Sequence, residues 1–213
     1  MIRLYDYWRS SAAYRVRIAL NLKGVPYARV PVNILPGKDE QLETAYQAVN
    51  PQMRVPAVEV DGRVAGQSLA IIEWIDEVFE GPALLPMDPW LRLQARAFAD
   101  VIACDIHPLN NLSPLEVLRR DFGADEAAIN RWYSDWIVRG FAALEAMAGE
   151  YQRGAFLFGE APTIAEIVLV PQVANARRFN VDLAAFPRLV ALDEACQALE
   201  AFQRAAPENQ PKD

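Results

Sequence analysis

The sequence contains few of the residues from which metal sites and disulfide frameworks are built. Among its 213 residues are one histidine, His107, and two cysteines, Cys104 and Cys196. A single histidine rules out a multi-histidine metal site. Two widely separated cysteines in apolar, helix-like surroundings form neither a disulfide framework nor a metal motif. We therefore predict no metal, and a reducing compartment, the cytoplasm.

Long apolar runs and an excess of positive charge are also missing. No stretch approaches the roughly 20 apolar residues that span a bilayer, and charged residues interrupt any signal-peptide pattern near the N-terminus. The net charge of −7 disfavours nucleic acid or an anionic membrane as a partner. No G-x-S-x-G motif is present, which argues against a serine hydrolase. An anionic substrate would have to be held by local arginines.

The residues that are present indicate a globular chain of two unlike parts. Hydrophobic residues make up 53% of the sequence, and its length fits one large domain or two small ones. Residues 1–79 alternate strand and helix patterns in the order β-α-β-α-β-β-α, with Asp61-Gly62 as a two-residue hairpin signal. We predict an α/β domain over residues 1–80, a proline-rich linker over 81–89, and an all-helical domain over 90–213.

Local signals predict where several helices begin and end. Pro108 should end the first helix of the second domain. The sequence Thr163-Ile164-Ala165-Glu166 matches a capping box ahead of a strongly apolar core helix, and the polar stretch 207–213 should be frayed. In the first domain, Ser68 is the expected N-cap of the helix that follows it. Helical periodicity in the second domain covers residues 90–106, 125–148, 167–173 and 189–199.

A pair of serines stands where the first predicted strand gives way to the first helix. Ser10 and Ser11 follow the alternating run 2–5 and precede a helical pattern that ends at Gly24. Free N–H groups and the helix dipole at such a position favour a thiolate or a carboxylate. The alternative is that one serine simply caps the helix. We expect Arg15 and Arg17, further along this helix, to lie on its surface or at a subunit interface.

Five motifs stand in order along the chain. They are Ser10-Ser11-x-x-x-Arg15-Val16-Arg17-Ile18-Ala19-Leu20, Asn50-Pro51-Gln52, Gln67-Ser68-Leu69-Ala70-Ile71-Ile72-Glu73, Asp105-Ile106-His107-Pro108-Leu109-Asn110-Asn111 and Leu169-Val170-Pro171-Gln172-Val173-Ala174-Asn175-Ala176-Arg177-Arg178-Phe179. In this order and at compatible spacing, the motifs together resemble the zeta class of glutathione transferases, the maleylacetoacetate and maleylpyruvate isomerases. The resemblance implies a thioredoxin-like N-terminal domain, a helical C-terminal domain, glutathione as cofactor, a homodimer and a cis bond before Pro56.

The resemblance also implies an activity and a role for particular residues. Glutathione thiolate would add to the cis double bond of a maleyl dicarboxylate, the bond would rotate, and elimination would give the fumaryl isomer. Ser11 would be the hydroxyl closer to the sulfur and Ser10 the second, both lowering the pKa of the thiol. Arg9 and Arg178 would hold the carboxylates of the substrate. The residues implied for glutathione are Ser10, Ser11, Gln41, Val55, Gln67, Ser68, His107 and Asn111.

Each of these residues also has an ordinary structural interpretation. Taken alone, Gln41 reads as exposed surface, His107 as a structural histidine, and Asn111 as loop polarity. Ser68 alone reads as a helix cap, and the pair Arg177-Arg178 as a solvated face.

The substrate remains open between close alternatives. Leu112 resembles the maleylacetoacetate type, because some maleylpyruvate isomerases carry an arginine there, whereas the stretch 122–130 resembles the maleylpyruvate branch. We favour maleylacetoacetate. Ala12 stands where a cysteine often follows the serines, which puts thiol-exchange side activities in doubt. A transferase acting on α-halo acids would share the site, and a non-catalytic interaction module would not need it.

Overall fold

The computed structural model describes residues 1–212, and their contacts divide the chain into two compact units. The first unit contains Met1–Leu84 and also the chain from Gln197 onward, while the second contains Leu85–Cys196. By its contacts the end of the chain thus belongs with the N-terminal unit, although it follows the helical domain in sequence. Among residues 1–212, no helix combines the length and apolar character needed to cross a bilayer.

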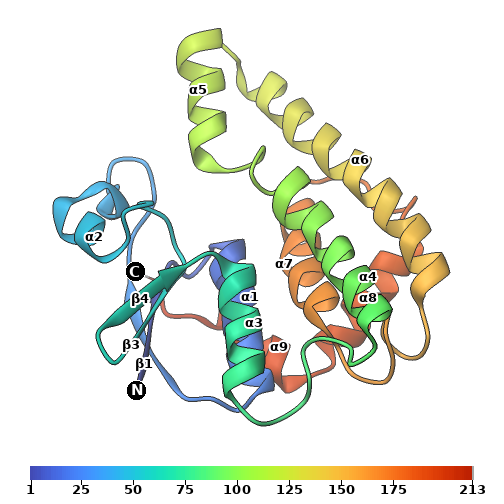
Figure 1. Ribbon diagram of the computed structural model, residues 1–213. Helices are drawn as coiled ribbons and strands as arrows, with labels where there is room; N and C mark the ends of the chain where they lie inside the picture. The colour runs from blue at the N-terminus through green and yellow to red at the C-terminus, as the bar shows by residue number, and fades with distance from the viewer. Residues whose placement is uncertain (213) are drawn as a thin grey trace. The chain divides into compact units, whose positions relative to one another are not determined.

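The first unit is built on a four-stranded mixed sheet with strand order β2-β1-β3-β4 (Figure 1). β1 (Ile2–Asp6) pairs in parallel with β2 (Tyr27–Pro31) and antiparallel with β3 (Ala57–Val60), which pairs antiparallel with β4 (Arg63–Gly66). Asp61 and Gly62 both adopt positive φ, 51° and 74°, as the predicted hairpin requires. The mixed sheet followed by a helical unit confirms the predicted fold class.

Helices cover this sheet according to the alternation of side chains along β1. Tyr5 packs with Tyr46 of the short helix α2 (Thr44–Val49), which follows the 3₁₀ turn η1 (Glu40–Leu42). Leu4 and Asp6 point to the opposite face, where α1 (Ser11–Leu22) and α3 (Ser68–Val78) lie side by side. α9 (Glu200–Ala205) packs on α1, and the 3₁₀ turn η3 (Pro207–Asn209) follows it.

Three predictions for this unit were wrong, and packing of the chain's end on α1 explains two of them. Arg15 and Arg17 are 2% and 0% exposed, not surface residues, because α3 and α9 cover the helix. The polar tail is not frayed, since Arg29 Nη1 donates to the Pro211 carbonyl at 2.9 Å; Asp213 lies outside the described residues. Finally, Gln67 and not Ser68 is the N-cap of α3, because the helix begins at Ser68 itself.

The second unit consists of helices arranged around α7 (Ile164–Arg178). Its first ten residues, Ile164–Val173, are all buried, which confirms the predicted core helix. The predicted capping box is present too: Thr163 caps the helix, and Glu166 accepts from the Thr163 backbone N–H at 2.8 Å. The other helices are α4 (Pro89–Asp100), α5 (Leu112–Phe122), α6 (Glu126–Tyr151) and α8 (Pro187–Gln197).

Two features of the second unit differ from the prediction. The long helix expected from Trp90 to Ile106 is α-helical only to Asp100 and continues as a π-helix, η2 (Val101–Ile106). This widened turn carries Ile106 against Gly140 of α6, at a place where a methyl group on Gly140 would overlap the Ile106 side chain. α5 was not predicted, although Asn111 caps its start and Gly123, at φ 64°, ends it.

The buried Glu166 generates a stability prediction. Its carboxylate is fully buried and also accepts from the Leu157 backbone N–H at 2.8 Å. Burial raises the pKa of this carboxyl, and hydrogen bonds from Thr163 and Leu157 oppose that rise. Glu166→Ala should lower the free energy of unfolding by about 3 kcal/mol, since it leaves buried donors without an acceptor.

Denaturant unfolding monitored by circular dichroism measures this effect. The matched control is Glu126→Ala, which removes an exposed first-turn glutamate of α6 and should cost less than about 0.5 kcal/mol. Equal losses for the two variants would show that the capping box contributes nothing beyond a surface pair.

Candidate functional site

The serine turn, Tyr7–Ser11, connects β1 to α1. The Ser10 backbone N–H donates to the Tyr7 carbonyl at 2.9 Å, which closes the turn. Ser10 is the N-cap of α1, and its Oγ accepts from the Ala13 backbone N–H at 3.3 Å. The capping interpretation therefore holds for Ser10, while Ser11 is the first residue of the helix and is half-buried. Both hydroxyl-bearing residues stand at a helix N-terminus, where an anion is favoured.

Strand register brings further predicted residues to the same edge of the sheet. Tyr5 lies opposite Ala57, and Ala57 lies opposite Gly66, so β1 ends, β3 begins and β4 ends at one edge. Val55 precedes β3 there, joined to Pro56 by a cis peptide bond, as the family resemblance predicted. Gln67 and Ser68 follow β4 at this edge and open α3. Two helix N-termini and the Val55 backbone thus lie along one border of the first unit.

Ser68 has a buried cationic neighbour that the sequence analysis missed. Arg15 Nη1 donates to Ser68 Oγ at 3.3 Å, and both residues are less than a tenth exposed. A guanidinium beneath the first turn of α3 adds positive charge to the dipole of that helix. The two residues come from different helices, 53 positions apart, so helical periodicity alone carried no signal for the contact.

Gln67 holds an unusual backbone conformation at this edge. Its φ of 69° and ψ of 107° lie outside the regions that non-glycine residues favour. Its Nε2 donates to Gln52 Oε1 at 2.9 Å. Strained backbone of this kind persists where surrounding structure imposes it and is frequent at functional sites.

Two further predicted residues of the first unit, Gln41 and Arg9, lie outside helices α1 and α3. Gln41 lies in η1 and is half-buried, whereas the sequence taken alone predicted exposed surface. Its Oε1 is buried and has no hydrogen-bond partner among residues 1–212. A buried acceptor of this kind can receive an N–H from a ligand. Arg9 lies in the serine turn, with its guanidinium 5.4 Å from the centre of the Trp8 ring.

In the second unit, two residues next in sequence to predicted ones, Asn110 and Phe179, contact one residue of α6, Tyr133. The loop after η2 contains His107 and Asn111, and within it Asn110 Nδ2 donates to the Tyr133 carbonyl at 3.1 Å. The Tyr133 ring stacks on Phe179, and the Arg178 guanidinium lies 5.1 Å from the Phe179 ring centre.

Electrostatics and capping define this second group further. Burial raises the pKa of Tyr133 to about 12, although the nearby Arg178 charge opposes the rise. Asn111 is more than loop polarity, because its Oδ1 accepts from Leu112 N at 2.7 Å and caps α5. Tyr133 itself was not predicted, since a buried tyrosine in a helical stripe is normally core.

Comparison with known proteins agrees with this architecture. A family model described as "Glutathione S-transferase, N-terminal domain" matches residues 4–83, and one described as "Glutathione S-transferase, C-terminal domain" matches residues 126–202. A Ralstonia sp protein named maleylpyruvate isomerase is 53% identical over 99% of both chains. A Rhizobium meliloti protein named maleylacetoacetate isomerase is 49% identical over 96% of this chain and 95% of its own length.

Solved structures of similar proteins agree with the sequence comparisons. The holo structure of a maleylpyruvate isomerase, described as a bacterial glutathione-S-transferase in zeta class, has a TM-score of 0.95 at 52% identity and covers 98% of both chains. A maleylacetoacetate isomerase from Anaeromyxobacter dehalogenans with GSH bound in its active site has a TM-score of 0.87 at 45% identity, covering 99% of this chain and 97% of the other. The chain belongs to the glutathione S-transferase family. Within that family it belongs to the zeta class, with the maleylacetoacetate and maleylpyruvate isomerases.

Gln67 provides a test of strain held at the candidate site. Gln67→Gly should raise the free energy of unfolding by about 1 kcal/mol, because glycine adopts positive φ without a Cβ clash. The same change should weaken binding of glutathione, measured by isothermal titration calorimetry. Gln52→Ala is the control, because it removes the side-chain hydrogen bond and leaves the Gln67 backbone unchanged. A Gln67→Gly protein no more stable than the parent would contradict the strain.

Proposed function

We propose that this chain is a glutathione-dependent cis–trans isomerase that converts maleylacetoacetate to fumarylacetoacetate. The observation that carries the proposal is near-complete coverage by relatives with isomerase names, combined with a serine pair at the start of α1. Related structures hold glutathione in their active sites. In this chain, the helix N-termini and the buried Gln41 acceptor fit an anionic tripeptide with amide donors.

Each residue at the sheet edge has a proposed part in binding. Ser11 donates its hydroxyl hydrogen to the sulfur, and Ser10, fixed as the helix cap, is the second hydroxyl near it. Ser68, supported by Arg15, receives the γ-glutamyl carboxylate together with Gln67. The Val55 backbone pairs with the cysteinyl backbone. Gln41, His107 and Asn111 are proposed to contact the glycyl end or the region of the thiol.

The residues of the chain act by stabilising charge and orienting groups. Glutathione, when bound, supplies the thiolate that adds to the cis double bond and leaves after rotation about it. Ser11 and the α1 dipole favour the ionised sulfur and so lower the pKa of the thiol from its ordinary value of about 8.5. Arg9 and Arg178 are proposed to bind the two carboxylates of the substrate, which keeps its ends in place. Electrostatic stabilisation is the main contribution.

A second substrate is favoured by one comparison. The Ralstonia relative named maleylpyruvate isomerase shares 53% identity with this chain, against 49% for the Rhizobium protein named maleylacetoacetate isomerase. Leu112, which is exposed, stands in the position where some maleylpyruvate isomerases carry arginine and favours maleylacetoacetate. The two substrates share the maleyl group, so the same serine turn would serve either one.

We also propose that the protein is a cytoplasmic homodimer. Exposed apolar side chains on α4, Trp90 at 65% and Leu93 at 52%, support association with a second copy. Within residues 1–212, Cys104 and Cys196 are not joined in a disulfide, which supports a reducing compartment.

The serine assignment predicts a specific loss on substitution. Ser11→Ala should reduce turnover roughly ten- to hundredfold, because a hydrogen bond to a charged sulfur is removed. The pKa of the bound thiol should rise, which ultraviolet titration of the thiolate measures. Ser113→Ala, at an exposed position in α5, is the matched control and should leave both values unchanged. A bound-thiol pKa in Ser11→Ala equal to that of the parent protein would show that Ser11 does not stabilise the thiolate.

Glutathione dependence and substrate choice are tested in one assay. Maleylacetoacetate and maleylpyruvate, supplied side by side, should both remain unconverted when glutathione is left out. With glutathione, we expect the fumaryl product of maleylacetoacetate to form faster, followed by chromatography. An α-halo acid in the same panel tests transferase activity. Equal conversion with and without glutathione would overturn the proposed function.

A further inference from the structure

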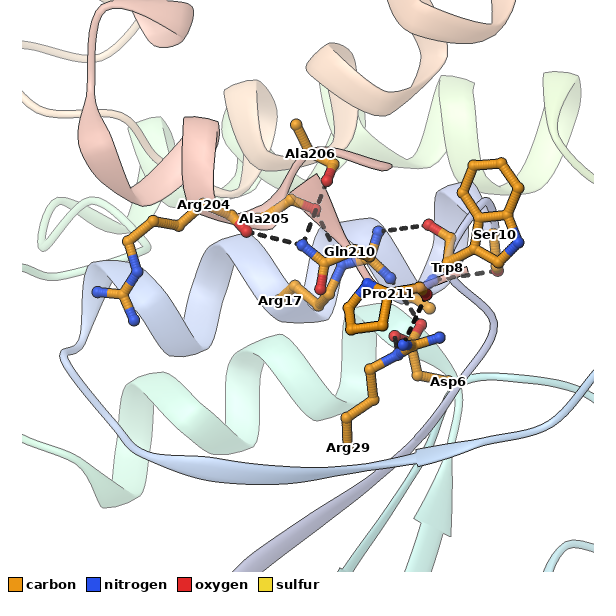
Figure 2. Close-up of polar contacts among 11 residues, drawn as sticks. Asp6, Trp8, Ser10, Arg17, Arg29, Arg204, Ala205, Ala206, Gln210 and Pro211 are labelled. Atoms are coloured by element: carbon orange, nitrogen blue, oxygen red, sulfur yellow. Dashed lines mark hydrogen bonds and ion pairs between the residues drawn. The ribbon is translucent and has the colours of Figure 1, made fainter. Parts of the chain in front are cut away.

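A buried arginine, Arg17, connects the C-terminal part of the chain to the serine turn. Arg17, on α1, is fully buried, and its three nitrogens bind three separate parts of the first unit (Figure 2). Nη1 donates to Asp6 Oδ1 at 2.6 Å and Nη2 to the Trp8 carbonyl at 3.0 Å. Nε donates to the Ala205 carbonyl at 2.9 Å, at the end of α9. One guanidinium therefore joins β1, the serine turn and the C-terminal helix.

A second arginine continues this connection to the last residues described. Arg29, on β2, donates through Nε to Asp6 Oδ2 at 2.7 Å and through Nη1 to the Pro211 carbonyl at 2.9 Å. Figure 2 shows Arg17 and Arg29 converging on Asp6, with Pro211 next to them. Lys212 Nζ lies 5.6 Å from the centre of the Trp8 ring. The segment Ala206–Lys212, named the C-terminal tail here, thus contacts the serine turn at Trp8 and its supporting arginine at Pro211.

Two side chains fold the tail back onto α9. Asn209 Nδ2 donates to the Gln203 carbonyl at 2.7 Å. Gln210 Nε2 donates to the Arg204 carbonyl at 2.7 Å and to the Ala206 carbonyl at 3.2 Å (Figure 2). This brings Pro211 to Arg29. Asp6 is fully buried, so its two oxygens hold both arginines in a nearly fixed geometry. Trp8 is two residues ahead of Ser10, and a shift of its carbonyl would shift the capped start of α1.

We propose that the C-terminal tail is a positioning element for the serine turn, acting through Arg29, Asp6 and Arg17. Its carbonyl at Pro211 holds Arg29 on Asp6, Asp6 orients Arg17, and Arg17 fixes the Trp8 carbonyl ahead of Ser10 and Ser11. The proposal rests on the proposed function, because it assigns the tail a part in setting the pKa of a bound glutathione thiol. It extends that function to residues about 200 positions away from the serines in the chain.

Gln210→Ala tests the proposal without touching the serine turn or the buried ion pair. The variant should release Pro211 and Lys212 while Asn209 still holds the first part of the tail on α9. Hydrogen exchange of the Ser10 and Ala13 amides should accelerate roughly threefold to tenfold, the effect of about one lost hydrogen bond. In ultraviolet titration of the glutathione-bound protein, the fraction of thiolate at neutral pH should fall by a similar factor. The unfolding temperature should match that of the control.

The matched control is Gln203→Ala, on α9. Gln203 Nε2 donates to the Gln197 carbonyl at 2.8 Å, so this variant also loses a glutamine-to-carbonyl bond, made to the last residue of α8 and not to the tail. Arg29→Lys is the second variant, because lysine can keep its charge on Asp6 but cannot bridge to the Pro211 carbonyl as well. If both variants act through one connection, the double variant Gln210→Ala/Arg29→Lys should show no more than the larger single effect.

The possible outcomes distinguish failure of the tail's positioning role from failure of the proposed function. Exchange of Ser10 and Ala13 is measured without glutathione, so it reports on the turn even if the proposed cofactor does not bind. If the parent protein binds glutathione with a lowered thiol pKa but Gln210→Ala behaves like Gln203→Ala in both measurements, the tail has no positioning role and the function stands. Faster exchange with unchanged thiol titration would likewise overturn the proposal, leaving the tail a purely structural anchor. An ordinary thiol pKa in the parent would overturn the proposed function and this inference together.

Discussion

A fully buried ion pair between Asp6 and Arg17 joins the end of the central strand to the first helix. Burial lowers the pKa of Arg17, and the charge of Asp6 opposes that shift. Charges taken out of water are tolerated only when every polar atom finds a partner in good geometry, so such a pair allows few alternative arrangements. Here the partners are a strand carboxylate, a turn carbonyl and a carbonyl of α9. The position of α1 relative to the sheet, and with it the first turn of that helix, depends on this arrangement.

The features that sequence patterns predicted correctly are local ones. The capping box at Thr163 and Glu166 and the hairpin at Asp61 and Gly62 each depend on residues within a few positions of one another. The core helix was recognisable because nearly every residue in it is apolar. By contrast, Arg15 and Arg17 read as surface residues, since their burial depends on α3 and on an α9 that follows them by about 180 positions. The π-helix at Val101–Ile106 also depends on a distant residue, Gly140.

The residues of the candidate site also differ in how far local sequence patterns could predict them. Ser10 and Ser11 were recognisable from a strand-to-helix transition, whereas Val55, Gln67 and Gln41 carried no chemical signal apart from the family resemblance. Strand register then explains why segments from different parts of the chain meet at one edge. Arg15 and Tyr133 were missed because a buried arginine and a buried aromatic look like a surface charge and a core residue in sequence.

The contacts that hold the end of the chain are made almost entirely to main-chain oxygens. Ala205 and Pro211 offer carbonyls to the two arginines, and Arg204 and Ala206 offer theirs to Gln210. A carbonyl is present whatever the side chain, so substitutions at Arg204, Ala205 and Ala206 can accumulate with little effect on these contacts while the path of the backbone and the Gln210 side chain are kept. Divergence in sequence there would be a poor guide to importance. Lys212, the last residue described, lies beside the Trp8 ring, so an affinity tag fused at this end of the chain would add residues close to the serine turn, whereas Met1 is 93% exposed and suits a tag better.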